Sequence, residues 1–180
     1  MEILDALDQT FEHAPHVIGN VRPDQLDNKT PCAEWTVRDL LEHQIGVVAG
    51  LGAAAAGEPR PSFTLGNDPA AQFAEVSAAT LQAWRAPGAL DQMIDAGPGP
   101  MPGRVLAGIN LLDTATHTWD LATATGQPPA LPAGVAAAAI EASQQIVTPQ
   151  LREGRFGPAV AAPEGADATT QLIAFLGRTP

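Results

Sequence analysis

Residues 110–126 read NLLDTATHTWDLATATG, and this stretch predicts the helix around which the rest of the chain is organised. Asp113, His117 and Asp120 are spaced i, i+4 and i+7, so at about 100° per residue they fall within roughly 60° of one another on one helix face. Gly126, followed closely by two prolines, ends the helix. The neighbouring stripe is apolar: Leu112, Ala115, Trp119 and Ala122. A stripe of two acids and one histidine beside a packing surface indicates a site for a divalent metal.

The composition describes one acidic globular domain. The 180 residues are 45% hydrophobic and 16% charged, which is enough to bury a core. We predict a single domain over 1–180, with its core at about 1–126 and a C-terminal addition over 127–180. The net charge of −11 and the pI near 4.5 argue against nucleic acid and anionic membranes as partners, because both require basic patches.

The chain carries features that favour the cytoplasm. No apolar run approaches the roughly 18 residues needed to span a bilayer. The acidic, amphipathic N-terminus lacks the basic and continuous apolar regions of a signal peptide. The single cysteine excludes an internal disulfide, as expected in a reducing compartment. A homodimer is compatible with the sequence, which does not determine the oligomeric state.

Apolar periodicity and helix-end residues divide the chain into helices separated by proline-bearing loops. Residues 97–103 read GPGPMPG and predict a loop, whereas extended structure is compatible with residues 90–94 and 156–161. The fold class is all-α, most simply an antiparallel four-helix bundle with a C-terminal addition. The expected helices cover about 2–20, 36–56, 68–84, 102–125, 133–147 and 168–176.

A complete metal site needs a third ligand from a second helix. His43 lies on the inward stripe of the helix expected at 36–56, and it can face Asp113 and His117. Two histidines and one carboxylate leave a coordination position open, as in catalytic sites for Zn, Ni, Co or Fe(II). Asp120 would then orient a ligand or accept a hydrogen bond beside the metal. The alternative is a salt-bridged, metal-free bundle in which His43 is a hydrogen-bonded core residue.

Other chemistries have less support in the sequence. The chain has no P-loop and no G-x-S-x-G motif. Cys32 is the only thiol, and it would need a nearby base such as His43 to act as a nucleophile. Packing of a small side chain between the loop and the bundle is the simpler interpretation of Cys32. Trp35 precedes the helix start and suits a hydrophobic packing role there.

Three segments resemble one protein family. TPCAEWTVRDLLEH at 30–43 and HTWDLATATG at 117–126 look like the two metal-bearing helices of mycothiol-dependent maleylpyruvate isomerases, in their N-terminal domain. AFLGR at 174–178 resembles the end of a mostly uncharacterised actinobacterial subgroup. The resemblance implies a DinB-like four-helix bundle that holds a divalent metal, usually zinc.

Carried over position by position, the resemblance implies the ligands His43, Asp113 and His117. The isomerase has Glu where this chain has Asp113, which is one methylene shorter, so direct ligation needs a closer approach of the helix. We also expect no separate domain after the bundle of the kind the isomerase carries, so the substrate pocket of the isomerase need not be present.

These observations predict a cytoplasmic metal-binding protein that acts on a small molecule. The resemblance implies an isomerase or an S-transferase that joins a low-molecular-weight thiol such as mycothiol to a small electrophile. The metal would bind the thiol sulfur as thiolate or act as a Lewis acid. No catalytic or thiol-binding residue is assigned from the sequence. The alternative is a non-catalytic bundle that binds metal or a small molecule as a sensor or interaction module.

Overall fold

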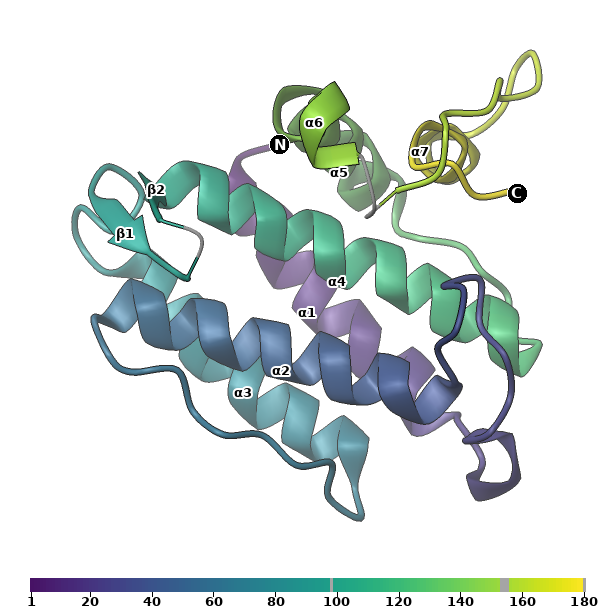
Figure 1. The fold of residues 1–180 in the computed structure, drawn as a ribbon, viewed down its shortest axis with the longest axis horizontal. Helices are drawn as coiled ribbons and strands as arrows, with labels where there is room; N and C mark the ends of the chain where they lie inside the picture. Colours follow the sequence, from purple (N-terminus) through teal and green to yellow (C-terminus); the bar gives the residue numbers. More distant parts are fainter. Residues whose placement is uncertain (98, 153–155, 180) are drawn as a thin grey trace.

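The computed structural model describes residues 1–97, 99–152 and 156–179, with only the backbone of residue 151. Long helices dominate the fold and run side by side in Figure 1. The helices that surround the main core are α1 (Ile3–Gly19), α2 (Val37–Ala56), α3 (Pro69–Arg85) and α4 (Gly103–Thr125). A short 3₁₀ turn, Pro23–Gln25, lies in the connection between α1 and α2.

The packing of these helices follows from their apolar faces. Both α1 and α2 lie against α3 and α4, so each long helix has two long neighbours. α4 is buried over most of its surface, with Leu106, Leu111 and Leu121 at 0–1% exposure. The predicted all-α class is confirmed, with a small two-stranded sheet added. The expected helix ends differ from the observed ones by at most two residues.

The C-terminal addition is a second group of helices on the α4 side (Figure 1). It contains α5 (Ala133–Ile146), the single-turn helix α6 (Pro149–Arg152) and α7 (Ala168–Phe175). α5 packs against α4 and α1, and α7 packs against α5. The sequence did not predict α6, and residues 156–161, expected as an extended piece, form no strand. This group brings the end of the chain back toward α4.

Part of the segment expected as a loop forms a strand. β1 (Met93–Asp95) pairs antiparallel with β2 (Pro100–Pro102), with Ile94 opposite Met101. The prediction of loop over the whole of residues 97–103 is therefore wrong for its second half. Two prolines are tolerated in β2 because both strands of a two-stranded hairpin are edges, where missing N–H donors are not required. The expected extended structure at 90–94 is present at its end, as β1.

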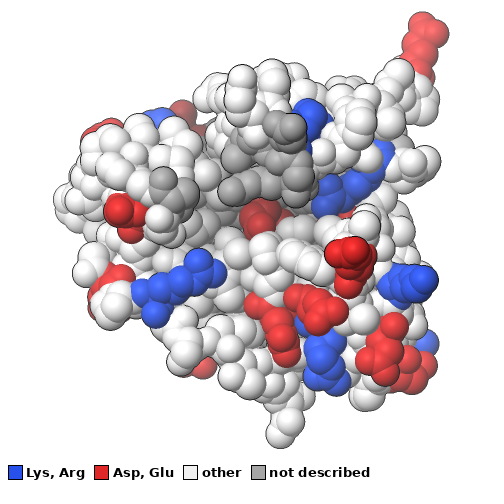
Figure 2. All heavy atoms as spheres, in the orientation of Figure 1, with Lys and Arg blue, Asp and Glu red and all other residues white. Residues whose placement is uncertain are grey.

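Charged side chains on one face of the molecule occur in small groups within a largely uncharged surface (Figure 2). Acidic and basic groups are interspersed there, so the net charge of −11 is not gathered into a single acidic patch on this face. Among the described residues, no helix combines the length and the hydrophobicity needed to cross a membrane.

The start of α2 is fixed by a reciprocal cap. The Thr36 hydroxyl accepts a hydrogen bond from the Asp39 amide at 3.3 Å, and the Asp39 carboxylate accepts from the Thr36 amide at 2.9 Å. This capping box satisfies two amides that the helix itself leaves unpaired. It also sets where α2 begins, and therefore which of its residues face α4.

Thr36→Ala removes the side-chain acceptor at this cap. We expect the variant to lose about 1 kcal/mol of unfolding free energy, as other N-cap replacements do. Urea denaturation measures the loss. Thr36→Ser keeps the hydroxyl and serves as the control, with a smaller loss expected. An alanine variant as stable as wild type would contradict the assignment of this cap.

Candidate metal centre

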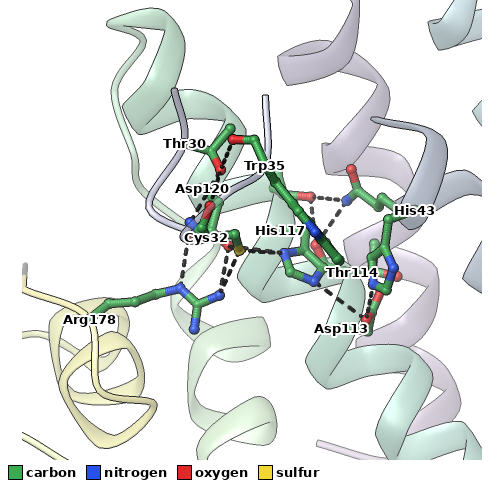
Figure 3. A network of polar contacts seen from close by, with 11 residues as sticks. Thr30, Cys32, Trp35, His43, Asp113, Thr114, His117, Asp120 and Arg178 are labelled. Carbon is green, nitrogen blue, oxygen red and sulfur yellow. Dashed lines mark hydrogen bonds and ion pairs between the residues drawn. The ribbon is translucent and has the colours of Figure 1, made fainter. Parts of the chain in front are cut away.

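Three donor atoms from α2 and α4 converge on one point (Figure 3). Nε2 of His43 lies 3.0 Å from Oδ1 of Asp113, and Nε2 of His117 lies 3.5 Å from the same oxygen. All three donor atoms lie within 4.8 Å of one another. The structure therefore brings together the three residues predicted as metal ligands.

Side chains next to His43 hold α2 and α4 in this relation. Gln44 is fully buried, and its amide donates to the Thr114 carbonyl at 3.1 Å and to the Thr118 hydroxyl at 3.0 Å, both on α4. Trp35 covers the two imidazoles, with ring centroids 4.5 Å from His43 and 5.9 Å from His117. The Trp35 indole and the hydrogen bonds from Gln44 to α4 together limit how far the His43 ring can move.

The far side of His117 is held by a buried ion pair. Nδ1 of His117 lies 2.9 Å from Oδ2 of Asp120, which is 0% exposed. The Arg178 guanidinium donates a hydrogen bond to each oxygen of the same carboxylate, from Nε to Oδ1 at 2.7 Å and from Nη2 to Oδ2 at 2.8 Å. Such a carboxylate–histidine pair fixes ring orientation and proton position in metal sites. Asp120 thus lies against the ring nitrogen of His117 that faces away from Asp113.

Cys32 reaches this group from the loop before α2. Its sulfur lies 3.3 Å from Asp120 Oδ2, 3.8 Å from His117 Nδ1 and 3.4 Å from Arg178 Nη2. The loop is tied by the Thr30 hydroxyl, which donates toward the carbonyls of Cys32 and Trp35. Glu34 adopts φ of 74°, a conformation that residues other than glycine rarely adopt. Local backbone strain of this kind often accompanies functional sites.

Burial and neighbouring charges shift the pKa values of the ionisable groups in opposite directions. Burial raises the pKa of the Asp113 carboxyl, but the imidazoles of His117 and His43 outweigh it and hold that pKa below its ordinary value. Burial lowers the pKa of His117, yet the Asp113 and Asp120 carboxylates outweigh it and raise that pKa well above the usual range.

Burial and neighbouring charges also have opposite effects on the pKa values of the Asp120–Arg178 ion pair. Burial raises the pKa of Asp120, but His117 and Arg178 outweigh it and hold that pKa below its ordinary value. The pKa of Arg178 is raised, because Asp120 outweighs the effect of burial. Without metal, the two carboxylates therefore favour the protonated form of the His117 imidazole that lies between them.

The donor set fits a divalent cation. Bonds of about 2.0–2.1 Å in tetrahedral geometry place ligand atoms about 3.3 Å apart, close to the observed 3.0 and 3.5 Å separations. The second carboxylate oxygen of Asp113 is buried and has no hydrogen-bonding partner among the described residues. A buried acceptor without a partner is costly, and a cation at this point would relieve that cost. The shorter Asp113 side chain reaches the point on which both imidazoles converge.

A cavity of about 1390 Å³ opens beside the three donors. Its walls come from α2, α4, the loop carrying Cys32 and the C-terminal residues 176–178. Thr116 also lines it, and the Thr116 hydroxyl is buried without a partner among the described residues. The apolar part of the wall includes Val47, Leu51, Leu106, Ile109 and Leu112.

Sequence reasoning did not identify two residues of the site. The sequence favours a packing role for Cys32, and Cys32 does pack against the core, but its sulfur also lies beside Asp120 and His117. For Arg178 the sequence offers only the terminal resemblance over residues 174–178. It lies 58 positions after Asp120, and no periodicity or spacing connects residues so far apart. Only the return of the chain end to α4 brings them together.

The buried carboxylates predict a pH dependence of stability in metal-free protein. Asp113 and Asp120 have folded pKa values below the unfolded value of about 3.9, so the unfolded state binds more protons in acid. Their contribution is complete well above that value and is lost as the pH falls below about 5. We expect Asp113→Asn to flatten the acid limb of unfolding free energy against pH, measured by urea denaturation with EDTA.

The control for that experiment is Asp27→Asn, at an exposed position. Its acid limb is expected to follow that of wild type. Equal slopes for wild type and Asp113→Asn between pH 6 and 3 would show that Asp113 has no such linkage.

Comparison with known proteins agrees with this geometry. Two uncharacterized proteins from two strains of Mycobacterium tuberculosis are each 38% identical to the chain over 165 residues, covering 91% of this chain and 90% of each relative. No solved structure gives a significant match. Residues 8–122, which include His43, Asp113 and His117, match the family described as the mycothiol maleylpyruvate isomerase N-terminal domain. The chain therefore belongs to the mycothiol maleylpyruvate isomerase N-terminal domain family.

Proposed function

We propose that this protein binds one divalent metal ion, most simply zinc, through His43, Asp113 and His117. We further propose that it is a thiol-dependent isomerase or S-transferase acting on a small electrophile. The observation that carries the proposal is the convergence of two Nε2 atoms and one carboxylate oxygen beside a large cavity. In this proposal α1 to α4 form a DinB-like four-helix bundle, and the site is open on the cavity side.

The residues of the chain have separate tasks in this proposal. A bound ion would supply a position for the sulfur of a thiol cofactor such as mycothiol, kept as thiolate, or polarise a substrate carbonyl. Asp120 keeps a proton on Nδ1 of His117 and so leaves Nε2 directed at Asp113. Trp35 shields the imidazoles on one side. Apolar walls would hold the substrate in the cavity.

The three proposed ligands leave one coordination position of the metal open. Three protein ligands of this type leave room for a fourth ligand, as catalytic zinc sites do. The alternative function, a non-catalytic module that binds metal or a small molecule, needs no thiol at that position. Cofactor binding at the metal therefore separates the two functions.

The test uses the full chain loaded with Co²⁺, whose absorption reports its ligands. Addition of mycothiol is expected to produce a thiolate-to-cobalt charge-transfer band in the near ultraviolet, and S-methylated mycothiol, the control, is expected to produce none. Cobalt binding without the band would overturn the thiol-dependent function and favour the non-catalytic module. Failure to bind cobalt or zinc at all would overturn both.

A further inference from the structure

Two overlapping donor sets share His117. The first consists of His43, Asp113 and Nε2 of His117, and the second consists of Cys32, Asp120 and Nδ1 of His117. A neutral imidazole carries a proton on one nitrogen and a lone pair on the other, so it serves one set at a time. The second set offers a thiol, which soft divalent metals prefer. Some feature of the molecule must therefore select the first set.

We propose that Arg178 is the positioning residue that makes this selection. Its guanidinium occupies the cation position of the second donor set, and it holds Asp120 as the acceptor for Nδ1–H of His117. This inference rests on the proposed metal binding at His43, Asp113 and His117. It adds that the C-terminal segment decides on which side of His117 an ion binds.

The contacts of Arg178 support the first half of this role. Nε donates to Asp120 Oδ1 at 2.7 Å, and Nη2 donates to Asp120 Oδ2 at 2.8 Å while lying 3.4 Å from the Cys32 sulfur. The Arg178 side chain is 13% exposed and Asp120 is fully buried, so solvent screens the pair little. A divalent ion bound to Cys32 and Asp120 would lie against this fixed positive charge. Arginine cannot lose its proton to relieve the repulsion.

The second half of the role follows from the same carboxylate. With both oxygens held by the guanidinium, Asp120 has a fixed orientation, and its Oδ2 lies 2.9 Å from Nδ1 of His117. A carboxylate in that place favours the proton on Nδ1. The lone pair is then on Nε2, which is the atom directed at Asp113 (Figure 3).

Arg178 lies outside the segment that defines the family. The family match ends at residue 122, whereas Arg178 follows α7 in the C-terminal addition. Gly177, at φ 81°, passes against the backbone of Gly157, where a side chain would not fit. The Arg178 amide donates to the Ile173 carbonyl at 3.0 Å. These backbone contacts hold the chain end where the guanidinium reaches Asp120.

The experiment compares Co²⁺ spectra of the full-length protein without added thiol. Wild type is expected to show no thiolate-to-cobalt band. Arg178→Gln is expected to gain one, and the double variant with Cys32→Ser is expected to lose it again. Arg85→Gln, which removes an exposed arginine paired with Asp8 at 2.6 Å, is the control and should match wild type. Arg178→Lys keeps the cation and should also remain without the band.

A second measurement follows the proton of His117 in zinc-loaded protein. ¹⁵N NMR is expected to show wild-type His117 with its proton on Nδ1 and zinc on Nε2. In Arg178→Gln the imidazole signals should shift toward a mixture of the two arrangements. A merely structural arginine would not exchange the two nitrogens.

Outcomes separate this inference from the proposed function. Metal binding with identical spectra in wild type and Arg178→Gln overturns the inference and leaves the function standing. A Cys32-dependent band in wild type also overturns it. Absence of metal binding in wild type overturns the proposed function, and with it the selection of a donor set that rests on it. If Arg178→Gln does not fold, Cys32→Ser alone decides, since a changed cobalt spectrum contradicts the selection and an unchanged one supports it.

Discussion

His117→Ala is expected to abolish stoichiometric binding of a divalent ion and to destabilise the metal-free protein by about 3–5 kcal/mol. Metal binding is lost because the ring supplies one of only three protein ligands. Stability is lost because the imidazole lies between Asp113 and Asp120, and its removal takes one cationic partner from each of these two buried carboxylates. Elemental analysis after dialysis measures the first effect, and urea denaturation with EDTA measures the second.

The control is His16→Ala, which removes an exposed histidine on α1. It is expected to keep both metal content and stability. A His117→Ala protein that retains one ion per chain would show that the ion binds elsewhere. Retained stability would show that the carboxylates do not depend on the imidazole.

Asp120→Ala is expected to have the second-largest effect, a loss of about 3–5 kcal/mol in the metal-free protein. The change leaves the Arg178 guanidinium buried without its bidentate partner and frees Nδ1 of His117. Because the freed ring is no longer oriented, zinc affinity should fall by about 10–100-fold, the usual effect of losing such a supporting residue. Urea denaturation and competition with a chromophoric chelator measure the two quantities.

Asp8→Ala is the matched control for this change, since Asp8 also pairs with an arginine, Arg85, but at the surface. Surface pairs contribute about 0–1 kcal/mol, so a small loss and unchanged zinc affinity are expected. Equal losses for the two aspartate variants would contradict the special role of the buried pair.

Local rules were sufficient to predict the helices from the sequence. Thr36 and Asp68 accept hydrogen bonds from the third residue of α2 and α3, and Gly57 and Gly126 end α2 and α4 in the left-handed conformation. These effects depend on residues a few positions apart, which a single sequence displays directly. The small hairpin was only partly predicted, because β2 depends on pairing with β1 and its prolines favour a loop in isolation.

The site was predictable where its residues follow helix periodicity. Asp113, His117 and Asp120 lie on one face of α4 because of their spacing, and the inward stripe of α2 placed His43 toward them. The family resemblance supported the same pairing of helices. Positions within a helix are therefore recoverable from spacing alone.

The remaining contacts of the site depend on the path of the chain between helices. Cys32 reaches Asp120 through a strained loop, and Arg178 reaches it because α5 packs against α4 and α7 packs against α5. No repeat or spacing encodes such contacts, since they result from packing across more than fifty residues. Sequence reasoning therefore identified the face of the site toward His43 and left the Arg178 face unassigned.

The most direct test of the central claim is a crystal structure of the zinc-loaded protein with anomalous scattering measured at the zinc edge. The account predicts one anomalous peak per chain, about 2.0–2.2 Å from Nε2 of His43, Nε2 of His117 and a carboxylate oxygen of Asp113. The Arg178 guanidinium should remain on Asp120 in that structure. A peak bound to Cys32 and Nδ1 of His117, or no peak between His43 and His117, would contradict the account.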